Sequence, residues 1–270
     1  MPTSPRRSVI KKENRTNLRQ LLVSPFDRER GSGMDIECVS QTHVGLRRKV
    51  NEDSMLVRTD RGLWAVADGM GGHDAGDVAS AMITEALLRL PIVYGLDQLV
   101  ESAIGALGKV NRDLISLAAS DGAPRTIGST VVGLAIAGSQ YCCFWAGDSR
   151  AYRVRGGQIA QLTRDHSLVQ DLVSAGMLDE QEAHNHPNAN VITRAVGVTE
   201  ELKIETASGD VRSGDQFLLA SDGLTRLVDD SELAVELSSK HPADAVEALI
   251  ETVLSRGAPD NVTIIIAKVN

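Results

Sequence analysis

The chain has 270 residues, of which 42% are hydrophobic and 3% aromatic, and its formal net charge is -8. An acidic chain is a poor partner for nucleic acid, and no apolar run approaches the roughly 18 residues that a membrane-spanning helix needs. The three cysteines, two of them adjacent, do not form a disulfide framework. The first residues also lack the apolar core of a secretory signal. These features predict a cytoplasmic protein in a reducing compartment.

The N-terminal segment differs in composition from the rest of the chain. Residues 1–33 contain eight Lys or Arg, three Asp or Glu and three prolines, without a sustained hydrophobic period. Such a composition is typical of a disordered segment, and the run Gly31-Ser32-Gly33 resembles a linker. We therefore predict a disordered basic extension over 1–33 and a folded domain over 34–270.

The remaining chain shows clear strand and helix patterns. Short apolar or alternating runs predict strands at 36–42, 54–59, 63–67, 129–137, 140–146, 151–155, 158–162, 202–207, 216–220 and 262–269. Helical spacing of apolar residues predicts helices at about 74–90, 97–117, 168–175, 180–183, 230–238 and 242–254. The long helices come in consecutive pairs and do not alternate with the strands. This order favours an antiparallel α+β domain in which helix pairs cover sheets.

Four of the apolar runs have an aspartate at one end. The run LWAVADGMGGH brings Asp68 to a glycine-rich turn, and Asp148 and Asp222 also follow apolar runs. Asp260 instead precedes the apolar run VTIIIA. A single Asp-Gly pair is ordinary turn chemistry, but the recurrence predicts one shared site.

The predicted site offers oxygen ligands only: Glu52, Asp53, Asp68, Asp148, Asp222 and Asp260. Such donors select hard cations such as Mg²⁺, Mn²⁺ or Ca²⁺, and so many carboxylates would need more than one ion. Two ions about 4 Å apart can share a water and bind a phosphoryl oxygen. Arg47 and Arg48 are then candidate phosphate ligands, although both are also compatible with solvated loop charges.

Three other chemistries do not fit the sequence. The motif GDSRA at 147–151 is close to a nucleophile elbow, but a hairpin follows where that motif needs a helix. None of the cysteines has an arginine six residues later, as a cysteine phosphatase would. The run GMGGHDAG lacks the Gly-Lys-Ser/Thr ending of a phosphate-binding Walker loop.

Eight stretches resemble the metal-dependent serine/threonine phosphatases of type 2C, the PPM family, in their bacterial form. They are RKVNEDS (48–54), VADGMGGH (66–73), GSTVV (128–132), AGDSRAYR (146–153), LTRDHSLVQDLVSAG (162–176), HPNANVITRAVG (186–197), LLASDGLTRLV (218–228) and APDNVTIII (258–266). They occur in the family's order and cover residues 35–270, so that only the basic extension lies outside.

The resemblance implies a four-layer α-β-β-α sandwich of two antiparallel sheets, each flanked by a pair of antiparallel helices. It also implies a flap insertion at about 165–194, which includes Asp165, His166 and Ser167. Two Mn²⁺ or Mg²⁺ ions would bind at one edge of the sandwich, together with a third, weaker ion. The resemblance implies that Asp68 bridges the two ions, with the Gly69 carbonyl also contributing. It further implies Asp222 and Asp260 as ligands of the first ion, Glu52 of the second, and Asp148 with Asp222 of the third.

The implied activity is hydrolysis of phosphoserine and phosphothreonine in proteins by a metal-bridging hydroxide. Asp53 would orient the metal-bound water and Arg48 would hold the substrate phosphate, whereas Met70 stands where some members have a histidine. The expected partners are phosphorylated proteins and a cognate serine/threonine kinase, with the protein itself a monomer. The alternative is a non-catalytic, phosphoprotein-binding regulatory domain of the same fold.

Overall fold

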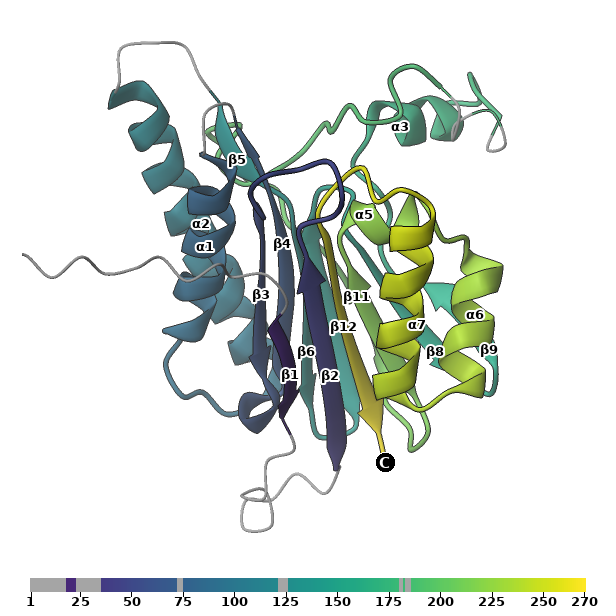
Figure 1. The fold of residues 1–270 in the computed structure, drawn as a ribbon. Coiled ribbons are helices and arrows are strands. Elements are labelled where there is room, and N and C mark those ends of the chain that lie inside the picture. The colour runs from purple at the N-terminus through teal and green to yellow at the C-terminus, as the bar shows by residue number, and fades with distance from the viewer. Residues whose placement is uncertain (1–17, 23–34, 72–74, 121–125, 180–181, 183–185) are drawn as a thin grey trace, which may run out of the picture.

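The computed structural model describes residues 18–22, 35–71, 75–120, 126–179, 182 and 186–270. Two antiparallel sheets form the centre of the molecule (Figure 1). The first has the order β1 (Leu18–Leu22), β2 (Ile36–His43), β12 (Val262–Val269), β11 (Gln216–Ala220), β8 (Arg150–Arg155) and β9 (Gln158–Gln161). The second has the order β10 (Glu205–Asp210), β7 (Gln140–Ala146), β6 (Val131–Ala137), β4 (Leu63–Gly71) and β3 (Asp53–Arg58), with β5 (Ile127–Ser129) paired to β4.

Helix pairs cover the outer faces of both sheets. The pair α1 (Gly76–Leu88) and α2 (Leu96–Ser120) lies on the second sheet, and the pair α6 (Asp230–Ser239) and α7 (Pro242–Ser255) lies on the first (Figure 1). Three short helices complete the described chain: η2 (Thr59–Arg61), α3 (Leu168–Ser174) and α5 (Asp222–Thr225). The predicted four-layer α+β sandwich is therefore confirmed. No helix in the described ranges is long and apolar enough to cross a bilayer.

The central strands, among them β6, β7, β11 and β12, are nearly continuous apolar runs because both of their faces are buried. In β4, Trp64 and Val66 pack between the two sheets, whereas Leu63, Ala65 and Ala67 pack against α1 and α2. Alternate side chains of a strand point to opposite faces, so one strand contributes to two apolar layers. The same division holds for β7 and β12, which gives the molecule three apolar layers between four layers of secondary structure.

The structure corrects several predicted boundaries. Strand β4 continues through Asp68 to Gly71, because its glycine-rich end pairs with β5 and not with β6. The single strand predicted at 129–137 is consequently divided into β5 and β6. Strand β10 begins at Glu205, three residues later than predicted.

The N-terminal prediction is only partly open to comparison. Within the extension predicted to be disordered, residues 18–22 form β1 and pair with β2, a strand that the composition of this segment did not predict. The other residues of 1–33 lie outside the described ranges. The same holds for His73 and for most of the short helix predicted at 180–183.

Candidate active site

The predicted acidic residues meet at one edge of the sandwich, at the ends of strands from both sheets. Asp53 is the first residue of β3 and lies directly opposite Asp68 of β4 in the strand register. Asp222 begins α5 just after β11, and Asp260 lies two residues before β12. Asp148 lies between β7 and β8. Residues separated by more than 200 positions are thus brought to one edge.

Asp53 is hydrogen-bonded through only one of its two carboxylate oxygens. Its Oδ2 atom accepts hydrogen bonds from the hydroxyls of Ser221 (2.8 Å) and Thr263 (2.7 Å). Its Oδ1 atom is buried and has no hydrogen-bond partner. Two fixed donors on one oxygen orient the carboxylate and leave the other oxygen available to a ligand.

Glu52 is positioned by two hydrogen bonds to its backbone carbonyl and by close packing against two glycines. Its carbonyl accepts hydrogen bonds from the Gly69 amide (3.1 Å) and from the Ser80 hydroxyl (2.6 Å). A Cβ atom on Gly69 would lie 2.0 Å from the Gly76 carbonyl oxygen, and a Cβ on Gly76 would lie 2.4 Å from Glu52 Oε1. Only glycine permits this approach of β4, the 44–52 loop and the start of α1.

Asp148 and Asp222 share one arginine. The Arg226 Nη2 atom lies 2.6 Å from Asp222 Oδ2 and 3.2 Å from Asp148 Oδ2. Both Oδ1 atoms are buried without a hydrogen-bond partner. As at Asp53, each carboxylate has one satisfied oxygen and one free oxygen.

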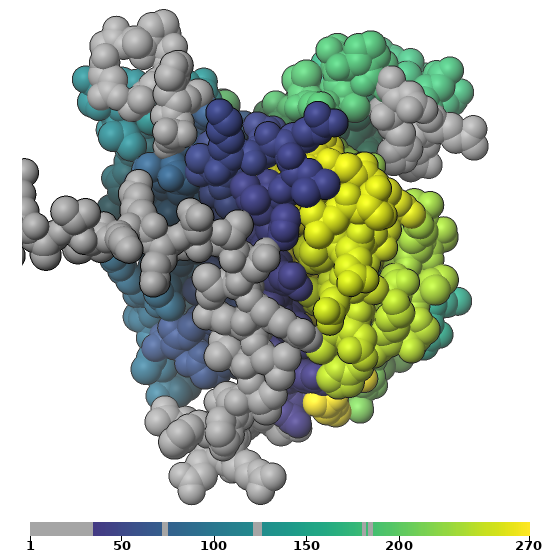
Figure 2. Space-filling model, in the orientation of Figure 1, coloured from purple at the N-terminus to yellow at the C-terminus, as the bar shows by residue number. Residues whose placement is uncertain are grey.

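Arg48 lies at the outer side of the cluster. Its Nη2 atom lies 2.8 Å from Asp260 Oδ2, and its side chain is half exposed. The loop that carries Arg48 is anchored by buried Asn261, which accepts a hydrogen bond from the Glu52 amide and donates to the carbonyls of Val44 and Val50. In the space-filling view this loop (purple) lies against the segment before β12 (yellow), beneath the flap (green) (Figure 2).

The clustered carboxyls have raised pKa values. Burial is the main cause in each case, and repulsion by neighbouring carboxylates adds to it. The pKa rises to about 6 for Asp53 and Asp222 and to about 7 for Asp148. For Asp68 the pKa lies well above its ordinary value, first because the carboxyl is buried and then because four other aspartates repel its charge. The site therefore favours whatever brings positive charge to its centre.

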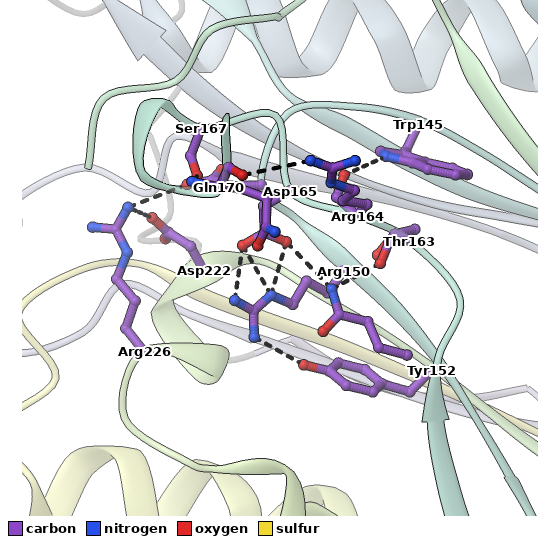
Figure 3. Close-up of polar contacts among 12 residues, drawn as sticks. Trp145, Arg150, Tyr152, Thr163, Arg164, Asp165, Ser167, Gln170, Asp222 and Arg226 are labelled. Carbon is purple, nitrogen blue, oxygen red and sulfur yellow. Dashed lines mark hydrogen bonds and ion pairs between the residues drawn. The ribbon is translucent and has the colours of Figure 1, made fainter. Parts of the chain in front are cut away.

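The three predicted flap residues lie at the root of the flap and act as anchors. Asp165 forms a two-pronged ion pair with Arg150, with its shortest contact at 2.8 Å (Figure 3). His166 accepts a hydrogen bond from the Gly147 amide through Nδ1 (3.1 Å), which ties the flap to the loop of Asp148. Ser167 caps α3 by accepting from Gln170 N, while backbone bonds pair 166–168 with 191–193.

The donor set fits divalent cations. All predicted ligands are hard oxygen donors. Two of them, Asp148 and Asp222, present a buried oxygen without a hydrogen-bond partner, as does Asp53, the residue predicted to orient water. Within the described ranges, no three acidic, His or Cys side chains already form a metal-binding group. Instead, Asp260 is paired with Arg48, and Asp148 and Asp222 are paired with Arg226.

Sequence reasoning missed the residues that support the predicted ligands. They include Ser221 and Thr263, which orient Asp53, and Asn261, which anchors the 44–52 loop. Ser221 directly precedes Asp222 and Asn261 directly follows Asp260, so adjacency to a predicted ligand was an available signal. For Arg226 the signal was its position four residues after Asp222, although the short helix α5 that brings the two side chains together was not predicted.

Comparison with known proteins places this chain in a family. The family model described as "Protein phosphatase 2C" matches residues 43–262. The serine/threonine protein phosphatase PstP of Mycobacterium tuberculosis is 37% identical over 235 residues, which are 83% of this chain but 43% of PstP. The protein phosphatase PhpP of Streptococcus pneumoniae is 35% identical over 85% of this chain and 96% of its own length. This chain thus spans less than half of the length of PstP and nearly all of PhpP.

Solved structures agree with the sequence comparison. PppA of Pseudomonas aeruginosa, described as a key regulatory component of T6SS, is 45% identical with a TM-score of 0.81 over 87% of this chain and 98% of its own. The catalytic domain of PstP in complex with two manganese ions is 33% identical with a TM-score of 0.77, over 87% of this chain and 98% of its own. This chain belongs to the protein phosphatase 2C family of serine/threonine phosphatases.

Proposed function

We propose that this chain hydrolyses phosphoserine and phosphothreonine in proteins with two bound divalent cations, Mn²⁺ or Mg²⁺. The observation that carries the proposal is the set of buried, unpartnered carboxylate oxygens on Asp53, Asp148 and Asp222. A buried anionic oxygen is unfavourable unless a donor or a cation compensates it. The manganese ions named for the PstP catalytic domain support the choice of a divalent cation.

The ligand assignment follows the family resemblance. Asp68 would hold both ions, with the Gly69 carbonyl also contributing, while Asp222 and Asp260 would hold the first ion and Glu52 the second. When bound, such ions supply Lewis-acid catalysis and lower the pKa of water. A third, weaker ion at Asp148 and Asp222 would have to share these carboxylates with Arg226.

Two residues have roles that their own contacts support. The Oδ1 atom of Asp53 is free while Oδ2 is fixed by Ser221 and Thr263, so Asp53 can accept a hydrogen bond from the attacking water and orient it. Arg48 is half exposed at the rim of the cluster and uses one terminal nitrogen on Asp260. Its remaining N–H donors can hold two oxygens of the substrate phosphate.

The partners follow from the same proposal. Phosphorylated proteins would be the substrates, and a cognate serine/threonine kinase would produce them. We place this reaction in the cytoplasm and propose that the chain works as a monomer. The names of PstP and PhpP as protein phosphatases support the substrate class.

The decisive test is phosphate release from a phosphothreonine peptide, with and without Mn²⁺. We expect manganese-dependent release by the wild type and its loss in Asp222→Asn, which removes a proposed ligand charge. Asp113→Asn is the matched control, because Asp113 pairs with Lys109 on the exposed side of α2. A wild type that binds Mn²⁺ and phosphopeptide but releases no phosphate would refute the proposal and favour the non-catalytic binding domain.

A further inference from the structure

The position predicted for a third ion is next to a cation that belongs to the chain. One nitrogen of Arg226, Nη2, contacts the Oδ2 atoms of both Asp222 and Asp148. Figure 3 shows the Arg226 side chain reaching toward Asp222 beside the flap root. A single positive group that bridges two carboxylates holds the place that a shared metal ion would take.

Local structure explains why Arg226 reaches both carboxylates. Asp222 is the first residue of α5, and Arg226 follows the helix, with its amide donating to the Asp222 carbonyl (3.0 Å). Side chains four residues apart on a helical turn lie on the same face. The Arg226 side chain is 37% exposed, whereas Asp148 and Asp222 are 7% and 10% exposed. The arginine therefore enters the acidic pair from the solvent side and retains room to turn outward.

The contacts divide the carboxylate oxygens into two sets. Arg226 engages both Oδ2 atoms, while both Oδ1 atoms remain buried and unpartnered. Asp222 can thus serve the first ion through Oδ1 while Arg226 holds its Oδ2 atom. A divalent ion coordinated by both Oδ2 atoms would instead face the guanidinium at contact distance, and two cations cannot share that position.

We propose that Arg226 is a built-in counter-ion that replaces the third metal ion. It neutralises the pair formed by Asp148 and Asp222, so the site takes up two divalent ions and admits a third only when Arg226 turns outward. This inference rests on the proposed two-ion site and adds the residue that limits its metal stoichiometry.

The test is a Mn²⁺ titration of the purified chain, with free Mn²⁺ followed by electron paramagnetic resonance. We expect the wild type to bind two ions per chain, and Arg226→Met and Arg226→Gln to bind a third ion about tenfold or more tightly than the wild type does. Arg226→Lys keeps a positive charge and should retain the wild-type stoichiometry. Circular dichroism establishes that each variant is folded.

Arg89→Met is the matched control. Arg89 also pairs with an acidic residue four positions earlier, Glu85, but on an exposed part of α1, so it tests the mere loss of one positive charge. Equal third-ion affinity in the wild type, Arg226→Met and Arg226→Gln would overturn the inference and leave the two-ion proposal standing. A wild type that binds fewer than two ions would refute the proposed two-ion site itself, and the inference with it.

Discussion

Replacement of Asn261 by alanine should loosen the loop that carries Arg48. The Asn261 side chain accepts from the Glu52 amide at 2.8 Å and donates to the carbonyls of Val44 and Val50 at 2.9 Å and 3.0 Å. Each hydrogen bond contributes about 1 kcal/mol, so the loss of three should lower the free energy of unfolding by roughly 3 kcal/mol. Because the loop also places Glu52 and Arg48, the KM for a phosphopeptide should rise.

Urea unfolding in the presence of EDTA measures the change in the free energy of unfolding without a contribution from bound metal. Steady-state phosphate release measures the change in KM. Asn270→Ala is the control, because Asn270 is exposed at the end of the chain. Asn261→Asp provides a contrast: it keeps the acceptor for Glu52 N but turns an anionic oxygen toward two carbonyls, and should be at least as destabilising. If Asn261→Ala lost less than about 0.5 kcal/mol, the range of ordinary surface substitutions, its proposed anchoring role would be wrong.

Two further predictions concern the charge and the packing of the site. Because burial raises the pKa values of Asp53, Asp148 and Asp222 from 3.8 to about 6 or 7, the folded state binds more protons than the unfolded chain within this window. The free energy of unfolding of the metal-free protein should therefore fall by about a few kcal/mol as pH rises from about 4 to 7. Urea titrations at several pH values measure this dependence, and saturating Mn²⁺ should flatten it. An unchanged pH dependence with Mn²⁺ would contradict metal binding at these carboxyls. Gly76→Ala should displace the Glu52 side chain, since the new Cβ would lie 2.4 Å from Glu52 Oε1. Weakened Mn²⁺ binding by a folded variant would support this displacement, whereas wild-type Mn²⁺ affinity would refute it.

Most of the fold could be predicted because the hydrophobic pattern is strong in this chain. Strands such as β11 and β12 were predicted with their observed bounds, since apolar runs of this length have few alternatives. The prediction failed where pairing, not composition, decides a boundary. The glycines at the end of β4 resemble a turn, and only their pairing with β5 keeps them in a strand.

The site could be predicted as a set of charged residues but not as a set of contacts. Spacing identified the carboxylates, whereas the hydroxyls that orient Asp53 come from Ser221 and Thr263, which lie 168 and 210 positions away in the sequence. No local pattern reports a partner at that separation. Arg226 differs from these residues, because it lies only four positions after Asp222, and this spacing can be recognised in the sequence.

The balance of charge explains where cations are needed in this site. Arg48 neutralises Asp260 at the outer rim, and Arg226 neutralises Asp148 and Asp222 on the side of the flap. Between them, burial and then repulsion by four aspartates raise the pKa of Asp68 well above its ordinary value. Among the described ion pairs neither arginine pairs with Asp68, although the charge of Arg48 acts on it, so the centre around Asp68 is only partly compensated. Under the proposed function, a chain that supplies its own cations at both sides would need exogenous ions mainly at that centre, which supports the proposed pair of ions over a larger cluster.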